Sequence, residues 1–351
     1  MTLVPWRPRS RIRSLSKWEG PLERYELLHQ WTAASLGRND FDLTPASSDA
    51  SFRQYFRATF NGSNYIVMDA PPSHEDCRPF IEVAHLFAAA GVNVPKVLAK
   101  NLDQGFLLLS DLGPTTYLSV LTESNARELY LAANDALIKI QLASEPGILQ
   151  RYDRELLLRE MNLFPDWYVA KHLGQSITDA QARLMNQAFE QILSNNLAQP
   201  CVYVHRDYHS RNLMVSEPNP GILDFQDALY GPLTYDLASL YKDAYIKWDE
   251  EQVLDWLIRY WEAARKAGLP VTTDFYDFFR NFEWMGVQRH IKVLGIFARL
   301  YHRDGKDNYL KDMPRVMDYL RKACERYHEL HCMVRLLDHL ENRSAQTGYS
   351  F

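Results

Sequence analysis

The sequence has few cysteines, no long apolar run and little net charge, and each shortage argues against a class of protein. The four cysteines form no Cys-x-x-Cys pair and have no histidine at zinc-binding spacing, which argues against a disulfide framework and a structural zinc site. The net charge of −5 gives no general attraction to nucleic acid or anionic membranes. No apolar run approaches the roughly 18 residues of a membrane helix.

The two ends of the chain are polar. Residues 1–20 are basic and no long apolar segment follows them, so we do not expect a secretory signal. We predict a disordered basic arm there, with a docking arm as the alternative, and a frayed tail at 341–351. Together with the unpaired cysteines, these features predict a cytoplasmic protein that binds neither nucleic acid nor membrane.

The chain is long enough for two lobes with a real core. It has 351 residues, of which 46% are hydrophobic and 24% are charged, as in ordinary soluble globular proteins. We see no internal repeat and no low-complexity tract in it.

The stretch from 203 to 227 carries polar residues at a distinctive spacing. His205-Arg206-Asp207 is followed by Asn212, five positions after the aspartate, and Asp224 follows a short apolar run. Phosphoryl transfer needs a positioned base for the attacking hydroxyl and oxygen ligands for magnesium. The spacing therefore predicts a kinase catalytic loop, with Asp207 as the base and Asn212 and Asp224 as Mg2+ ligands. The alternative is that these are ordinary turn residues.

Apolar runs next to these residues predict a rigid frame. The runs at 201–204, 213–215 and 221–223 predict short strands that hold the polar side chains in place. Asp236 lies among apolar residues near the start of a further predicted helix. It either caps that helix or is a buried carboxylate that braces the catalytic loop by hydrogen bonds.

The first third of the chain mixes helix and strand signals. We predict helices at 21–36 and 78–90, and strands at 55–60, 65–68, 92–98 and 105–109. Asn61-Gly62 predicts a hairpin between the first two strands. The small-residue turn before them contains Ser47, Ser48 and Ser51 and leads to Arg53. Its amides and hydroxyls can face phosphate oxygens, although a plain surface turn is equally compatible with the sequence.

From Tyr117 onward the pattern is helical. We predict helices at 125–143, 154–171, 251–267, 274–301 and 314–340, the fourth with a bend near Gly286 or Gly295.

Four segments resemble the aminoglycoside phosphotransferase family over roughly residues 22–340. They are HRDYHSRN, ILDFQD, YGPLTYDLASL and LLLSDLG. The resemblance implies an α+β, bilobal protein-kinase-like fold, with a small N-lobe of antiparallel sheet plus helix and a larger, mostly helical C-lobe. The N-lobe would span 21–109, the hinge 110–113 and the C-lobe 114–340.

Longer segments resemble, within that family, bacterial kinases that act on the anomeric hydroxyl of amino sugars. They include TPASSDASFRQYFR, LFPDWYVAKHLG and GVQRHIKVLGIFARLYHRDGK. This resemblance implies ATP and Mg2+ as cofactors and N-acetylmuramate and N-acetylglucosamine as substrates. It also implies a role in peptidoglycan recycling, where a partner uridylyltransferase uses the sugar 1-phosphate.

The family resemblance also assigns roles to single residues. It supports Asp207 as base, and it implies braces at His205 and Asp236 and backbone contacts to adenine at Ser110 and Leu112. Nucleotide phosphates would meet the turn that holds Ser47, Ser48, Ser51 and Arg53.

One family feature is missing. The lysine that usually pairs with the nucleotide phosphates falls near Met68, a neutral side chain. Arg53, Arg57 or Arg78 would then have to supply the positive charge. Glu82, the matching helix carboxylate, has no such lysine to pair with and is equally explained as a surface residue.

The sugar pocket is predicted in the helical lobe. Aromatic rings can pack on a pyranose, and an arginine can bind a lactyl carboxylate through two hydrogen bonds. Against this, aromatics at helical spacing often belong to the core, and arginines often form a solvated face. The candidates are Trp167, Tyr168, Gln288, Arg289, Arg299 and Arg303, with the carboxylate assigned to one of the three arginines.

Two other functions stay open at this stage. One is a kinase for another hydroxylated molecule, such as an aminoglycoside or a choline-like alcohol, although no acidic groove or aromatic cage is evident near the motifs. The other is a nucleotide-binding protein without turnover, suggested by Met68.

Overall fold

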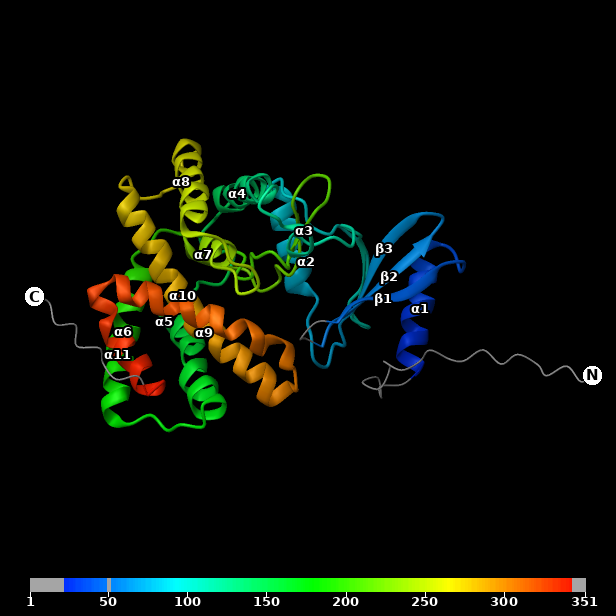
Figure 1. The fold of residues 1–351 in the computed structure, drawn as a ribbon. Helices are drawn as coiled ribbons and strands as arrows, with labels where there is room; N and C mark the ends of the chain where they lie inside the picture. Colours follow the sequence, from blue (N-terminus) through cyan, green and yellow to red (C-terminus); the bar gives the residue numbers. More distant parts are fainter. Residues whose placement is uncertain (1–21, 49–51, 343–351) are drawn as a thin grey trace, which may run out of the picture. The chain divides into compact units, whose positions relative to one another are not determined.

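The computed structural model describes residues 22–48 and 52–342, and the chain divides into two compact units (Figure 1). The sheet unit combines the chain up to Arg78 with Lys96–Asp111, and the helical unit combines Pro79–Pro95 with the chain from Leu112 onward. The predicted arm at 1–20 and nearly all of the predicted tail lie outside the described residues. Within the described part of the chain, no helix has the length and hydropathy to cross a membrane.

The sheet unit is built on five antiparallel strands in the order β1-β2-β3-β5-β4. The predicted Asn61-Gly62 hairpin is confirmed, and both residues have positive φ, as a tight two-residue turn requires. The turn expected from position 46 differs, because Ser47 and Ser48 pair with β2 as the end of β1. The strands are β1 (Asp42–Ser48), β2 (Gln54–Phe60), β3 (Ser63–Asp69), β4 (Val97–Asn101) and β5 (Phe106–Ser110).

Helix α1 (Leu22–Leu36) supplies the core of the sheet unit. Its Leu28 is fully buried against Phe56, Val67 and Phe106 of the sheet. Removing these apolar side chains from water drives the helix onto the sheet, at roughly 1.5–3 kcal/mol for each large side chain.

Helix α2 (Arg78–Ala89) packs within the helical unit, although the sequence placed it with the N-lobe sheet. Phe80 and Phe87 contact the ring of Phe225, with centroid separations of 4.9 and 5.9 Å. Phe87 also stacks on His205. The apolar face of α2 therefore covers the segment that carries the catalytic motif.

The helical unit also holds two small antiparallel pairs, which confirm the three short strands predicted around the motif. Strand β6 (Cys201–Val204) pairs with β9 (Leu229–Pro232), and β7 (Leu213–Met214) pairs with β8 (Gly221–Ile222). Around them lie α3 (Tyr117–Val120), α4 (Ala126–Leu142), α5 (Arg154–Met161), α6 (Asp179–Leu197), α7 (Tyr235–Tyr241), α8 (Glu250–Ala267), α9 (Phe275–Asp304), α10 (Met313–Arg326) and α11 (His331–Leu340).

Two predicted helices are interrupted. The helix predicted at 154–171 is α5 followed by a π-helical segment, Phe164–His172, because Pro165 has no N–H to continue the α-helical ladder. The helix predicted at 314–340 is split at Tyr327, whose extended backbone accompanies the packing of its ring on Trp284. Helix α6 was not predicted, although its Thr178 and Gln181 form a capping box that marks a helix start.

Helix α9 is one continuous helix, so the expected bend at Gly286 or Gly295 does not divide it. At Gly295, helix α9 packs tightly against Leu163, the residue just before the π-helical segment. A Cβ at this position would lie 2.4 Å from the carbonyl carbon of Leu163. Glycine is therefore required here by packing between the two segments.

Candidate active site

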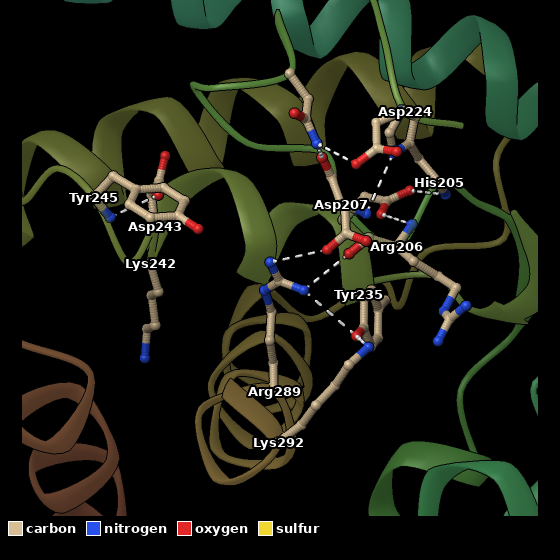
Figure 2. Close-up of polar contacts among 12 residues, drawn as sticks. His205, Arg206, Asp207, Asp224, Tyr235, Lys242, Asp243, Tyr245, Arg289 and Lys292 are labelled. Carbon is tan, nitrogen blue, oxygen red and sulfur yellow. Dashed lines mark hydrogen bonds and ion pairs between the residues drawn. The ribbon is translucent and has the colours of Figure 1, made fainter. Parts of the chain in front are cut away.

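The loop of the predicted catalytic motif runs from the end of β6 to the start of β7. Figure 2 shows three of its residues, His205, Arg206 and Asp207. Arg206 in this loop and Asp224 just after β8 have left-handed backbones, with φ of 76° and 63°. Such conformations are strained for residues other than glycine and persist where the surroundings enforce them. The strand pairs on both sides of the loop and the contacts described below provide that enforcement.

Asp236 forms the contacts expected of a brace. Its carboxylate, fully buried at the start of α7, accepts hydrogen bonds from the backbone N–H groups of His205 at 2.7 Å and Arg206 at 3.0 Å. Burial raises the pKa of Asp236 to about 7, while the two N–H donors oppose that rise. The carboxylate thus satisfies two backbone donors and fixes the turn immediately before Asp207.

His205 links the two halves of the motif. Its Nδ1 accepts a hydrogen bond from the Asp207 N–H at 3.3 Å, so Nε2, which lies 3.0 Å from the Leu223 carbonyl oxygen, must be the donor. Burial lowers the pKa of His205 to about 4, which keeps the ring in this neutral form. His205 therefore connects the backbone at Asp207 to the backbone just before Asp224 and holds the two segments together.

The Asp207 carboxylate faces cations of helix α9. Its side chain is 41% exposed, and its Oδ1 lies 3.7 Å from Arg289 Nη2. Arg289 is only 6% exposed and donates from Nη1 to the Arg206 carbonyl oxygen at 2.8 Å. Burial alone would raise the pKa of Asp207. The positive charges of Arg289 and Lys292 outweigh this effect and hold the pKa well below its usual range. The carboxylate is therefore held ionised and can accept a hydrogen bond from a hydroxyl group.

A buried ion network lies behind this pair and was not found from the sequence. Glu160 of α5 pairs with Lys292 Nζ at 3.0 Å and also with the Arg206 guanidinium. Lys292 Nζ donates to the Tyr235 hydroxyl at 3.0 Å, and Figure 2 shows it rising from the same helix as Arg289. The sequence signal was the pair of cations three positions apart in helix α9, a spacing that places both on one face of the helix.

Asn212 and Asp224 lie together with donors suited to magnesium. Asn212 Nδ2 donates to the Asp207 carbonyl oxygen at 2.9 Å and to Asp224 Oδ2 at 3.3 Å. No hydrogen bond found among the described residues uses Asn212 Oδ1. Gln226 Nε2 also orients Asp224 by donating to its Oδ1 at 2.8 Å. An amide oxygen and a carboxylate are hard ligands that fit Mg2+, with phosphate and water completing the shell.

Asn212 and Asp224 offer one amide oxygen and one carboxylate to such an ion. Across residues 22–48 and 52–342, no group of three or more histidine, cysteine, aspartate or glutamate side chains is arranged to hold a metal ion.

The predicted nucleotide residues lie in separate parts of the chain. Ser110 ends β5, where its Oγ accepts from the Lys96 N–H at 2.8 Å. Leu112 begins the second part of the helical unit. Ser51 and the side chains of Ser47 and Ser48 lie outside the described residues. These assignments stay predictions.

The three arginines considered as lysine substitutes each pair with a carboxylate. Arg53 pairs with Glu75 at 3.0 Å, Arg57 with Asp111 at 2.6 Å, and Arg78 with Asp76 at 2.9 Å. Met68 is fully buried in the sheet unit, and Glu82 is exposed. Which cation replaces the usual lysine stays a prediction.

The predicted sugar residues divide into two groups. Arg289 contacts Asp207, and the adjacent Gln288 is fully buried with no hydrogen-bond partner for its amide among the described residues. Tyr168 stacks on Phe164 and His172 within the π-helical segment, which also holds Trp167. Farther along α9 are Arg299, half-buried, and Arg303, exposed and paired with Asp304 at 2.8 Å.

The chain is similar to known proteins in sequence and in fold. The model of the phosphotransferase enzyme family matches residues 42–271. The chain is 51% identical over 336 residues to the N-acetylmuramate/N-acetylglucosamine kinase of Neisseria meningitidis serogroup B, covering 94% of this chain and 100% of that protein. It is 54% identical over 296 residues to the Pseudomonas aeruginosa protein of the same name, covering 84% and 88%.

A solved structure agrees with the fold. The ADP-bound aminoglycoside phosphotransferase APH(2'')-Ib superposes with a TM-score of 0.53 at 15% identity, over 85% of this chain and 97% of that chain. At this identity the likeness shows the fold alone.

Proposed function

Because the chain belongs to the phosphotransferase enzyme family, we propose that it transfers the γ-phosphoryl group of ATP to the anomeric hydroxyl of N-acetylmuramate and N-acetylglucosamine. The observation that carries the proposal is identity above 50% to two kinases of these sugars, which extends over the full length of one of them. The second support is the geometry around Asp207, an ionised and partly exposed carboxylate on a braced loop.

Each part of the site has a proposed role. Asp207 accepts the hydrogen bond, and then the proton, of the attacking sugar hydroxyl. Asn212 and Asp224 would hold Mg2+, which offsets negative charge on the nucleotide phosphates when it is bound. His205 and Asp236 keep the loop in its left-handed turn. The proposed nucleotide contacts remain Ser47, Ser48, Ser51, Arg53, Ser110 and Leu112.

We propose a cytoplasmic role in cell-wall recycling, since both substrates are cell-wall amino sugars. The product, a sugar 1-phosphate, has the chemistry that a uridylyltransferase uses to form a UDP-sugar. The enzyme would then supply that reaction.

The test is a coupled ATP-consumption assay with Mg2+ and a panel of acceptors. The panel contains N-acetylmuramate, N-acetylglucosamine, glucose, kanamycin and choline, and Asp207→Asn is the control. We expect turnover only with the two N-acetyl sugars, a phosphorus NMR signal of an anomeric phosphate, and a loss of roughly 10²–10⁴-fold in kcat for the variant.

Other results would point to the alternatives. Turnover of kanamycin or choline would indicate a kinase for another small molecule. Tight Mg-ATP binding without turnover of any acceptor would indicate a nucleotide-binding protein, and Met68 would be the first residue to examine.

A further inference from the structure

Arg211 is an arginine of the catalytic loop that the proposed mechanism does not use. It lies directly before Asn212, and its guanidinium carbon lies 4.6 Å from the centre of the Tyr245 ring and 5.8 Å from that of Tyr309. Arg211 is exposed, and none of the ion pairs found among the described residues includes Arg211. The acidic side chain nearby, Asp312, pairs instead with Arg315 at 3.2 Å.

The surroundings of Arg211 are held by one buried carboxylate. Asp243 accepts hydrogen bonds from Ser210 N at 3.0 Å, from Ser210 Oγ at 2.5 Å, and from Tyr245 N at 2.9 Å. Asp243 is 2% exposed. Asp243 therefore holds both Ser210, the residue before Arg211, and the backbone of Tyr245, whose ring lies beneath the guanidinium. An arginine held in this way loses less conformational entropy on binding a ligand.

Arg211 is also close along the chain to the reacting centre. His209 N donates to the Asp207 carbonyl oxygen at 3.0 Å, and the His209 ring meets the Tyr245 ring edge-on at 5.4 Å. On the other side, Asn212 Nδ2 donates to the same Asp207 oxygen. Both neighbouring parts of the loop are thus tied to Asp207, and Arg211 projects from the short segment between them.

The chemistry of this arrangement suits a carboxylate. Arg211 also makes polar side-chain contacts with Tyr245 and Tyr309. A guanidinium has five N–H donors, so donors remain for a two-point hydrogen bond with a carboxylate. N-acetylmuramate carries a lactyl carboxylate and N-acetylglucosamine does not. Arg289, which the sequence offered for this role, is buried and already contacts Asp207 and the Arg206 carbonyl oxygen.

We propose that Arg211 binds the lactyl carboxylate of N-acetylmuramate and sets the preference of the enzyme between its two sugars. The inference rests on the proposed function and adds the residue that distinguishes the acidic substrate from the neutral one. Tyr245 and Asp243 act through Arg211 as positioning residues.

The test combines a protein change with a substrate change. Steady-state kinetics are measured for the wild type, Arg211→Met and Arg211→Lys, with N-acetylmuramate, its neutral lactyl amide and N-acetylglucosamine. For Arg211→Met we expect kcat/KM to fall about tenfold or more with N-acetylmuramate, mainly through KM, and to stay within about twofold with the other two sugars. Arg211→Lys should keep part of the preference, because it keeps the charge but loses the planar fork.

Arg265→Met is the matched control. Arg265 is also exposed and also lies over an aromatic ring, that of Trp261 at 4.7 Å, on helix α8. We expect it to leave all three kcat/KM values unchanged.

Specific results would overturn the inference. An equal loss with all three sugars, or a raised KM for ATP, would mean that Arg211 acts on the phosphoryl group or on the loop. If Arg211→Met does not fold, the wild type and Arg211→Lys still decide, since equal turnover of the acid and its amide by the wild type would exclude recognition of the carboxylate. Failure of the proposed function would look different, because the wild type would then phosphorylate neither natural sugar.

Discussion

Arg289 Nη2 lies 3.7 Å from Asp207 Oδ1 while Nη1 of the same guanidinium donates to the Arg206 carbonyl oxygen. One buried arginine thus faces the proposed base and holds the left-handed residue before it. The two contacts connect helix α9 to the chemistry, and they explain why a fully charged side chain is retained inside the helical unit.

Replacing Arg289 should therefore reduce turnover with both sugars. For Arg289→Met we expect kcat to fall about 10–100-fold, the effect of losing hydrogen bonds to charged groups. Arg289→Lys should recover little, since one ammonium group cannot make both contacts. Kinetics with N-acetylmuramate and N-acetylglucosamine provide the check. A loss confined to N-acetylmuramate would instead assign the lactyl carboxylate to Arg289.

Glu160 should be important for stability rather than for substrate binding. In Glu160→Gln, the buried Lys292 and the partly buried Arg206 lose their anion, which we expect to cost about 3–5 kcal/mol in the free energy of unfolding. Urea denaturation of Glu160→Gln and of the double variant with Lys292→Met measures this. The double variant should be more stable than Glu160→Gln alone. If the two variants are equally unstable, the ion pair is not the cause.

Gly295 and Gly286 should respond oppositely to the same substitution. In Gly295→Ala the new Cβ would lie 2.4 Å from the Leu163 backbone, and we expect a loss of about 1–3 kcal/mol in stability. In Gly286→Ala the new Cβ would lie 3.2 Å from a side-chain atom, Cδ of Lys242, and not against backbone, while helix propensity favours alanine by about 0.5–1 kcal/mol. Thermal unfolding of both variants is the measurement. Similar losses in both would show that packing against Leu163 is not what requires glycine.

The sequence was most informative where the structure is local. Local spacing and turn chemistry predicted the short strands around the motif, the Asn61-Gly62 hairpin and most helices. The structure has these elements at the predicted positions. The sequence allowed two interpretations of Asp236, a helix cap or a brace of the loop. The brace was among them because a carboxylate amid apolar residues requires buried partners.

What the sequence did not provide depends on distant contacts. Glu160 and Lys292 are 132 positions apart (292 − 160), and no spacing rule connects α5 with α9. The same holds for Asp243, which lies just after α7 and holds Ser210, a residue 33 positions earlier in the chain. The π-helical segment and the break at Tyr327 also follow from packing that a periodic pattern does not show.

His290 should make stability depend on pH. Its Nε2–H donates to the Lys242 carbonyl oxygen at 3.2 Å, and its buried Nδ1 has no partner among the described residues. Burial, together with the charge of Lys242, lowers the pKa of His290 from 6.5 to about 3. The folded state therefore holds a neutral ring, and the unfolded state takes up the proton first as the pH falls.

The sign of the effect follows from this difference. The contribution of His290 to stability is complete above pH 6.5 and is lost progressively as the pH falls toward about 3, by up to roughly 1.4 kcal/mol per pH unit. Urea denaturation of the wild type and His290→Gln at pH 7.5, 6 and 5 isolates this term from the other titrating groups. We expect the stability advantage of the wild type to shrink at each step. An advantage that stays constant over this range would mean that the buried ring takes up its proton as readily as a histidine in the unfolded chain.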